Sequence, residues 1–170
     1  TASSQTDELI YSVNRTPETV FQTARATEVI TSEEIRRQNA RTLPELLMMA
    51  GVFVQQTNYG GGSPIIRGLM GKQILILIDG IKVNNAIYRT GPIQYLNTID
   101  LAMVERIEIV RGVVSVLGSD ALGGTINIIT RKGATPDLDT STNARFSARY
   151  STADQGIVGR AEAYGATGSL

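Results

Sequence analysis

The chain has 170 residues, 42% hydrophobic and 19% charged, which is typical of one folded domain with at most a short appendage. Its 16 basic and 16 acidic residues cancel and form no dense basic cluster, which argues against nonspecific nucleic-acid binding. It contains neither Cys nor His, so it lacks disulfides, thiolate nucleophiles and the commonest general base. We therefore expect no enzyme and no cofactor.

The first 24 residues are polar and hold one short apolar island, Leu9 to Tyr11. This composition predicts an extended, mobile leader. The leader lacks the basic stretch followed by an apolar core that marks a signal peptide. The longest aliphatic run in the chain, Ile74 to Ile78, is also far too short for a transmembrane helix.

Two short helices are predicted after a strand at residues 27–30. Thr31 and Glu34 have the spacing of a capping box, which satisfies free N–H groups at a helix start. Thr42 repeats the capping signal, and Gly51 should end the second helix.

Strand patterns then alternate with irregular segments. The predicted strands are residues 52–55, 65–68, 73–78, 81–83, 104–111 and 125–130. Residues 58–64 and 84–98 are rich in Gly, Asn and Pro without periodicity, so we expect two exposed loops of the kind that carry function. Asp79-Gly80 should form a hairpin turn. Short helices with a small mixed sheet indicate an α+β domain that ends near Lys132.

A polar linker at residues 133–142 precedes a different pattern. Ala144, Phe146, Ala148 and Tyr150 alternate with Arg145, Ser147, Arg149 and Ser151, and residues 157–164 continue as a partner strand. Such alternation fits either an ordinary half-buried hairpin or two strands of a transmembrane barrel, with apolar groups toward lipid and polar groups toward the lumen.

The glycine-rich segment 118–125 does not bind phosphate in the manner of a P-loop, because that loop needs Lys where this chain has Gly124. We interpret its glycines as turn and packing residues. Asp79 and Asp120 are accompanied by no base or metal-ligand set, so the residues predict no catalytic or metal site.

Three segments together resemble one family. They are Arg67-Gly68 followed by 73–80 (QILILIDG), 104–112 (VERIEIVRG) and 117–130 (LGSDALGGTINIIT). Their order and spacing are similar to those of the plug domain of TonB-dependent outer-membrane receptors, over about Asp7 to Lys132. Residues 7–15 are similar to the TonB box and the residues after it. The family usually has Pro where this chain has Val113 and an aromatic residue between Leu117 and Gly118, differences that concern only a loop.

The resemblance implies a plug that closes the lumen of a β-barrel in the outer membrane of a Gram-negative bacterium, with its leader facing the periplasm. The plug would bind a scarce nutrient, such as a ferric siderophore, haem or cobalamin, and admit it when TonB pulls on the leader. We expect residues 1–24 to be the leader, 25–132 the plug, 133–142 the linker and 143–170 the first two barrel strands. Two strands cannot close a barrel, so we expect a larger receptor.

The resemblance also implies three sets of site residues. The segment that binds TonB would be Glu8, Leu9, Ile10, Tyr11, Ser12 and Val13. The ligand would meet the apical loops at Tyr59, Gly60, Gly61, Asn84, Asn85, Tyr88, Arg89 and Tyr95. The barrel wall would contact Arg67, Arg111, Glu105 and Glu108, with the acids that face the two arginines lying outside this sequence.

One alternative from another class is a freestanding periplasmic binding or interaction domain with a plug-like fold. A coding sequence that continues with repeated ten-residue alternation would favour the receptor, and a stop codon with no barrel encoded nearby would favour the alternative. The sequence alone does not name the substrate.

Overall fold

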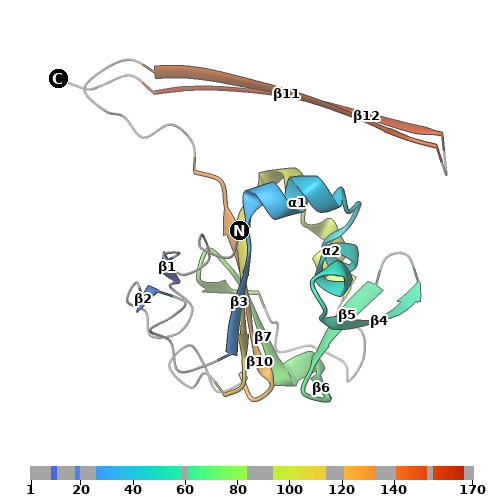
Figure 1. The fold of residues 1–170 in the computed structure, drawn as a ribbon, viewed down its shortest axis with the longest axis vertical. Coiled ribbons are helices and arrows are strands. Elements are labelled where there is room, and N and C mark those ends of the chain that lie inside the picture. Colours follow the sequence, from blue (N-terminus) through green and yellow to red (C-terminus); the bar gives the residue numbers. More distant parts are fainter. Residues whose placement is uncertain are drawn as a thin grey trace. The chain divides into compact units, whose positions relative to one another are not determined.

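A computed structural model describes residues 9–10, 18–19, 26–58, 61–83, 94–113, 121–132, 141–152 and 155–166. The chain divides into two compact units, Thr1–Thr130 and Arg131–Leu170, and each is described by itself (Figure 1). Among the described residues, no helix has the length and apolar character needed to cross a membrane.

The first unit is built on a five-stranded sheet with the order β3-β9-β10-β7-β8 (Figure 1). These strands are β3 (Ala26–Ile30), β9 (Val104–Arg111), β10 (Gly124–Thr130), β7 (Ile74–Ile78) and β8 (Ile81–Lys82). β10 runs parallel to β7, and all other neighbours in this sheet are antiparallel. The mixed sheet with short helices confirms the predicted α+β class.

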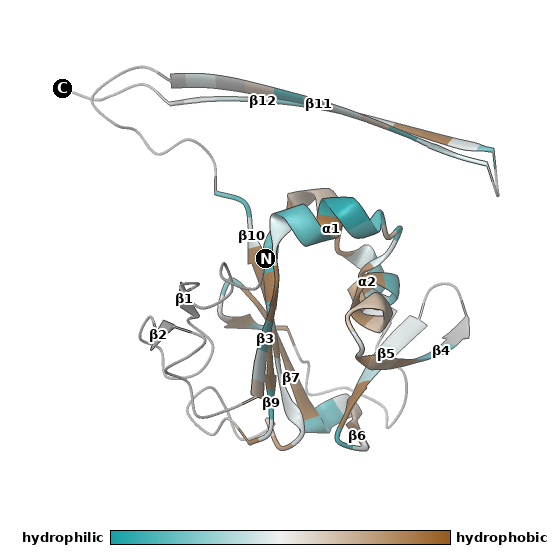
Figure 2. Cartoon of the chain, in the orientation of Figure 1, coloured by the Kyte–Doolittle hydropathy of each residue, from teal (hydrophilic) through white to brown (hydrophobic). Residues whose placement is uncertain are grey.

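One face of this sheet carries the main core. Because side chains alternate along a strand, the isoleucines that stand two residues apart in β7, β9 and β10 lie on the same face of the sheet. These residues are Ile74, Ile76, Ile78, Ile107, Ile109, Ile126 and Ile128, of which Ile78 is only partly buried. They pack with α1 (Ser32–Gln38) and α2 (Leu43–Met49), and the apolar colouring of the sheet is visible in Figure 2.

Both helices begin as the sequence predicts. The Thr31 hydroxyl accepts a hydrogen bond from the Glu34 N–H at 3.3 Å, and the Glu34 carboxylate accepts one from the Thr31 N–H at 2.9 Å. This reciprocal pair is a complete capping box. Thr42 caps α2 through the Glu45 N–H at 3.4 Å, with Pro44 in the first turn.

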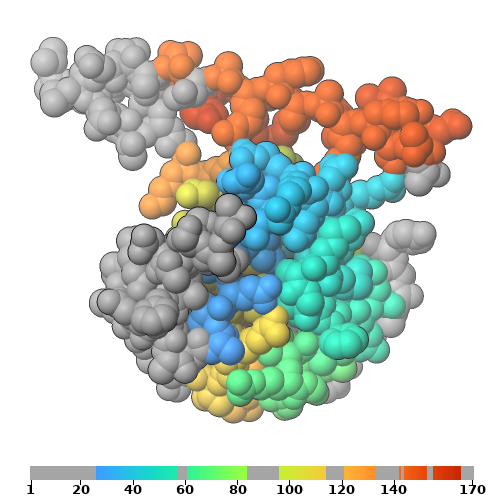
Figure 3. Space-filling model, in the orientation of Figure 1, coloured from blue at the N-terminus to red at the C-terminus, as the bar shows by residue number. Residues whose placement is uncertain are grey.

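A second, three-stranded sheet corrects one prediction. It consists of β4 (Phe53–Asn58), β5 (Gly61–Ile66) and β6 (Leu69–Met70). The loop expected over residues 58–64 was wrong, because Gly61 to Pro64 form a buried strand and only residues 59–60 separate β4 from β5. A Cβ on Gly62 would lie 2.7 Å from Cγ of Pro44, so the missing side chain lets β5 approach α2 closely. Figure 3 shows α1, α2 and β4 side by side on one face of this unit.

Short elements complete the first unit. β1 (Leu9–Ile10) and β2 (Glu18–Thr19) form an antiparallel pair in the leader. Within the described residues of this unit, the 3-10 turns η2 (Gly71–Gln73), η3 (Gln94–Thr98) and η4 (Leu101–Met103) lie between strands. η3 falls inside the loop predicted for residues 84–98, and its Leu96 is buried in the main core. Residues 84–93 lie outside the described part of the chain.

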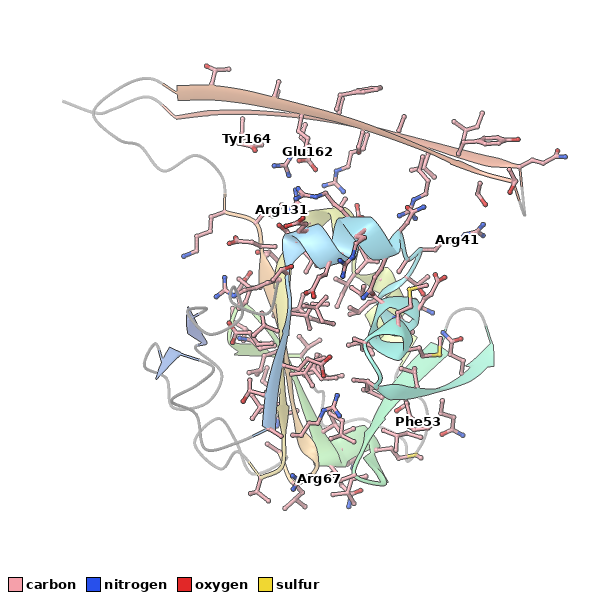
Figure 4. The ribbon with its side chains drawn as sticks, viewed as in Figure 1. Arg41, Phe53, Arg67, Arg131, Glu162 and Tyr164 are labelled. Carbon is pink, nitrogen blue, oxygen red and sulfur yellow. The ribbon has the colours of Figure 1, made fainter. Side chains whose placement is uncertain are left out.

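The second unit is an antiparallel hairpin of β11 (Ser141–Ser151) and β12 (Gly156–Ala166). Its register places Phe146 opposite Ala161 and Tyr150 opposite Ile157 on one face, where Phe146 is 76% and Ile157 79% exposed. The other face carries Arg145 opposite Glu162, and Glu162 forms an ion pair with Arg160. Both pairings lie on the polar face of the hairpin. The predicted alternation is confirmed, and Figure 4 shows Glu162 and Tyr164 pointing from the same side of β12.

Candidate functional site

Arg111 ends β9 at the end of the sheet where β3 and β10 begin. Its Nη2 lies 2.6 Å from Oε2 of Glu28, and both side chains are 37% exposed. Glu28 is the diagonal neighbour of Arg111 across the β3–β9 pair, which brings the two side chains to one face. The prediction that the acid facing Arg111 lies outside this sequence is therefore incomplete, because this chain supplies one such acid itself.

Arg67 reaches the same end of the sheet from a different strand pair. Arg67 and Gly68 form the two-residue turn between β5 and β6, with φ of 53° and 77°, so this segment is a turn and not the predicted strand. A Cβ on Gly112 would lie 3.2 Å from Nη1 of Arg67, so the guanidinium rests directly over that glycine. Figure 4 shows Arg67 at this end of the sheet.

The Arg67 guanidinium thus lies over Gly112, the residue that follows Arg111 in the chain. Arg111 is paired with Glu28, whereas Arg67 is exposed and has no ion-pair partner among the residues that the structure describes. Gly112 joins the two positions, since it follows Arg111 and lies under Arg67. An exposed guanidinium held in place by backbone geometry is suited to bind a carboxylate from outside this unit.

Close backbone packing surrounds this pair. The Gly112 N–H donates to the Gly123 carbonyl at 2.9 Å, and the Gly123 N–H donates to the Gln73 carbonyl at 2.8 Å. A Cβ on Gly124 would lie only 2.5 Å from the Val110 carbonyl oxygen. These contacts agree with the interpretation of Gly123 and Gly124 as packing residues rather than as part of a phosphate-binding loop.

The two acidic residues predicted to contact a barrel, Glu105 and Glu108, differ in how far their side chains are buried. Glu108 has no exposed side-chain surface, and its Oε1 lies 3.1 Å from both Nε and Nη2 of Arg106. Glu105 remains half-exposed and lies 3.6 Å from Nη1 of Arg106. The Glu108 carboxylate is thus already buried and paired within this chain. As long as it stays buried, it cannot contact a surrounding barrel wall as the sequence predicted.

Asp79 is more than the turn residue that the sequence indicates. It lies between β7 and β8 with φ of 51°, and its N–H donates to the Ile128 carbonyl at 2.9 Å. Its carboxylate accepts hydrogen bonds from the N–H and the hydroxyl of Thr130. The neighbouring Gly80 N–H donates to Oδ1 of Asn127 at 3.2 Å. The β7–β8 turn is therefore fastened to the last residues of β10.

The structure brings the arginines together but not the other predicted site residues. Leu9 and Ile10 form β1, where Ile10 pairs with Glu18, and Gly61 is buried in β5 rather than presented on a loop. Tyr95 lies in η3. The remaining predicted TonB-binding and ligand-binding residues lie outside the described part of the chain: Glu8, Tyr11, Ser12, Val13, Tyr59, Gly60, Asn84, Asn85, Tyr88 and Arg89. Among the described residues, no group of acidic side chains could hold a metal ion.

Sequence reasoning missed Glu28 and Arg106, the two partners inside this chain. Arg106 carried a usable signal, because residues two apart in a strand share a face and Arg106 stands two residues before Glu108. Glu28 carried none, since its pairing with Arg111 depends on which strands become neighbours.

Comparisons with known proteins agree with the fold described above. The family model described as the TonB-dependent Receptor Plug Domain matches residues 19–125. The vitamin B12 transporter BtuB of Vibrio cholerae is 39% identical over 127 residues, and the match covers 72% of this chain and 20% of the transporter. BtuB of Vibrio vulnificus is 32% identical over 155 residues, with 86% of this chain and 25% of the transporter covered.

Two solved structures show the same fold. The alcaligin outer-membrane receptor FauA of Bordetella pertussis matches 94% of this chain and 26% of its own, with a TM-score of 0.65 at 19% identity. The pyoverdine outer-membrane receptor FpvA of Pseudomonas aeruginosa matches 96% and 25%, with a TM-score of 0.64 at 21% identity. The chain thus spans about a quarter or less of the relatives it matches. Because the family model covers more than half of its length, this chain belongs to the plug-domain family of TonB-dependent receptors.

Proposed function

We propose that this chain is the plug-bearing part of a receptor that takes up a scarce nutrient across the outer membrane of a Gram-negative bacterium. The plug closes the lumen, and TonB, acting on the leader that faces the periplasm, opens it. Membership of the plug family supports the gating role. The relatives are named as transporters and outer-membrane receptors, which agrees with a chain that performs no bond chemistry.

The hairpin supports a barrel around the plug. Each of its strands has 11 residues, the length of a tilted transmembrane strand. Its two faces differ as those of a barrel wall do, with Phe146 and Ile157 exposed on one and Arg145 and Glu162 on the other. A freestanding periplasmic domain would gain nothing from such an apolar face, and an isolated hairpin is marginally stable in water.

Within such a receptor, Arg67 and Arg111 are placed to bind carboxylates of the barrel wall, with Glu105 as a further contact. Arg67 is the stronger candidate because it has no ion-pair partner in the described part of the plug. Arg111 would share its charge between Glu28 and the wall. Glu108 would join these contacts only if its face of the sheet were uncovered.

The ligand belongs to the class of ferric siderophores, haem and cobalamin, and it would bind at the loops that follow β4 and β8. Cobalamin is the first candidate, because the relatives at 39% and 32% identity are named vitamin B12 transporters. The siderophore receptors FauA and FpvA, at 19% and 21% identity, support the fold alone.

The test uses the full-length receptor in cells whose own cobalamin receptor has been deleted. Uptake of radiolabelled cobalamin should be restored, and it should be lost when TonB is also deleted, while cobalamin binding at the cell surface persists. Ferric siderophore and haem serve as parallel ligands. Uptake of none of the three, or equal uptake without TonB, would contradict the proposal.

A further inference from the structure

The turn between β7 and β8 holds the one place in the sequence where an aspartate or asparagine is followed by glycine, Asp79-Gly80. Glycine has no Cβ, so its backbone nitrogen approaches the carboxyl carbon of the preceding residue with the least steric hindrance. This approach begins the conversion of aspartate to isoaspartate, in which the main chain runs through the side-chain carbonyl. Among the aspartates of this chain, Asp79 therefore has the local sequence that most favours the conversion.

The conversion has two steps and needs no co-reactant other than water. The Gly80 nitrogen attacks Cγ of the protonated Asp79 carboxyl group, an N–Cγ bond forms, and the carboxyl hydroxyl leaves as water with the proton of the Gly80 N–H. Water then opens the five-membered imide. Cleavage of the new N–Cγ bond restores aspartate, whereas cleavage between that nitrogen and the main-chain carbonyl carbon of Asp79 gives isoaspartate of the same mass.

Burial does not protect this site, because Asp79 and Gly80 are both exposed. Hydrogen bonds hold both reacting groups instead. Thr130 donates its N–H to Oδ1 of Asp79 at 2.8 Å and its hydroxyl to Oδ2 at 2.6 Å. The Gly80 N–H donates to Oδ1 of Asn127 at 3.2 Å. The carboxyl group must leave both Thr130 donors, and the Gly80 peptide must leave Asn127, before Cγ meets the Gly80 nitrogen.

The groups that hold this turn all belong to β10. Besides Asn127 and Thr130, the Ile128 carbonyl accepts the Asp79 N–H at 2.9 Å. β10 lies between β9 and β7, paired on both sides, and Asn127 is only 3% exposed. A turn bound to a central strand has little freedom to bring its own atoms together. The protection is therefore a property of the folded sheet and not of the turn sequence.

We propose that Asp79-Gly80 is a modification site that forms isoaspartate when the β7–β8 turn opens, and that Thr130 and Asn127 keep it unreacted in the folded plug. Isoaspartate adds one carbon to the main chain of a two-residue turn. β8 then loses its register with β7, in which Ile81 lies opposite Ile78. The modified chain cannot rebuild the native turn, so the hydrogen bonds from β10 preserve the plug against irreversible damage at this point.

The readout is a single peptide. The 170-residue chain is incubated at neutral pH, folded in buffer and unfolded in urea, and trypsin then releases residues 73–82, in which Asp79 is the only acidic side chain. Its isoaspartate form is separated by chromatography and identified by methylation with an isoaspartate methyltransferase. Isoaspartate should form in the unfolded chain and at least about tenfold more slowly in the folded chain, because hydrogen bonds to a charged group must break first.

Two substitutions at Thr130 form a matched pair. Thr130→Val removes the hydroxyl donor and should raise the rate in the folded chain about tenfold. Thr130→Ser keeps the hydroxyl and should leave the rate within about twofold. Thr42→Ala controls for stability, because it removes the cap of α2 far along the chain from the turn. It should also leave the rate within about twofold, since the turn opens locally.

Asn127 has its own control on the same strand. Asn127→Ala removes the acceptor of the Gly80 N–H, whereas Thr125→Ala removes a buried hydroxyl that has no hydrogen-bond partner. Asn127→Ala should raise the rate about fivefold and Thr125→Ala by no more than about twofold.

Three results would overturn the proposal. Equal rates in the folded and unfolded chain, or no isoaspartate in either, would show that the fold protects nothing at this site. Equal rates for the Val and Ser variants at position 130 would remove the role of the hydroxyl. A rise with Thr42→Ala as large as that with Thr130→Val would mean that isoaspartate forms only through unfolding of the whole domain. None of these measurements involves TonB or a nutrient, so their outcome is independent of the proposed function.

Discussion

The Asp79 carboxylate binds both donors of Thr130, the N–H at 2.8 Å and the hydroxyl at 2.6 Å. Asp79→Ala removes both hydrogen bonds and places alanine at a positive φ, so it should lower the free energy of unfolding by about 2 kcal/mol. Thr130→Val removes only the hydroxyl and should cost about half as much, while Thr130→Ser should cost little. Urea denaturation checks all three, and equal effects of Val and Ser at position 130 would contradict this role of the hydroxyl.

Arg111→Ala should destabilise the isolated chain only slightly, by about 0.5 to 1 kcal/mol, because its ion pair with Glu28 is partly exposed and screened. A double-mutant cycle with Glu28→Ala measures this coupling. Arg67→Ala should cost less than about 0.5 kcal/mol, since Arg67 has no ion pair in the described chain. A larger loss at Arg67 than at Arg111 would contradict the geometry.

In the full receptor the same two substitutions should rank in the opposite order. Breaking a buried pair between Arg67 and a wall carboxylate costs about 3–5 kcal/mol, whereas Arg111 already shares its charge with Glu28 and so binds a wall carboxylate more weakly. Retention of the plug is measured as exclusion of large antibiotics from cells that express each variant. If Arg67→Ala leaves the barrier intact, then Arg67 has no docking partner.

Gly124→Ala should destabilise the plug strongly, by about 3 kcal/mol or more, because its Cβ would lie 2.5 Å from the Val110 carbonyl oxygen in a central strand. Gly68→Ala is the matched control. That position has a φ of 77° but open space around it, so only backbone strain of about 1 kcal/mol is expected. Thermal unfolding of both variants tests the difference, which similar melting temperatures would refute.

Ile10→Pro should abolish energised uptake by the full receptor while ligand binding at the cell surface persists. Ile10 lies in β1, and proline removes the N–H that a strand needs to pair with a partner. Ile10→Val keeps the backbone and should transport normally. Normal uptake by the proline variant would remove the TonB-binding role from this segment.

The two faces of the hairpin should differ in their tolerance of charge. Ala148→Arg places a cation on the apolar face and should cost about 2–4 kcal/mol of membrane insertion if that position lies near the bilayer midplane. Ser147→Arg, one residue earlier and on the polar face, should be tolerated. The heat-modifiable electrophoretic mobility of the full receptor reports assembly, and an equal defect in both variants would speak against a barrel wall.

The parts of the fold that the sequence predicted are those that depend on neighbours in the chain. The capping box of Thr31 and Glu34 and the alternating isoleucines of β9 and β10 are local patterns, and the structure confirms them. The strand at Gly61–Pro64 was missed because glycine and proline disfavour strands locally, whereas pairing with β4 and close packing against Pro44 favour one here. Tertiary contact outweighed local propensity.

The candidate site was predictable only in part for the same reason. Arg67 and Arg111 stood out because each precedes a glycine, but their proximity depends on Gly112 and on the turn between β5 and β6. The ion pair of Arg111 with Glu28 joins residues 83 positions apart. A single sequence contains no signal for such a contact.

The order of strands in the central sheet also constrains how this chain can fold during synthesis. β10 is the last strand of the first unit to be made, yet it lies in the middle of the sheet, between β9 and β7. β3 must wait for β9, and β7 must wait for β10, about 50 residues further along, for its parallel partner. A sheet whose strands pair over such long sequence separations forms slowly, and here only after β10 has been made. When the chain is synthesised from its N-terminus, the sheet around Ile74 to Ile78 therefore stays incomplete until Thr130 has been made, and those five aliphatic residues are exposed to aggregation during that interval.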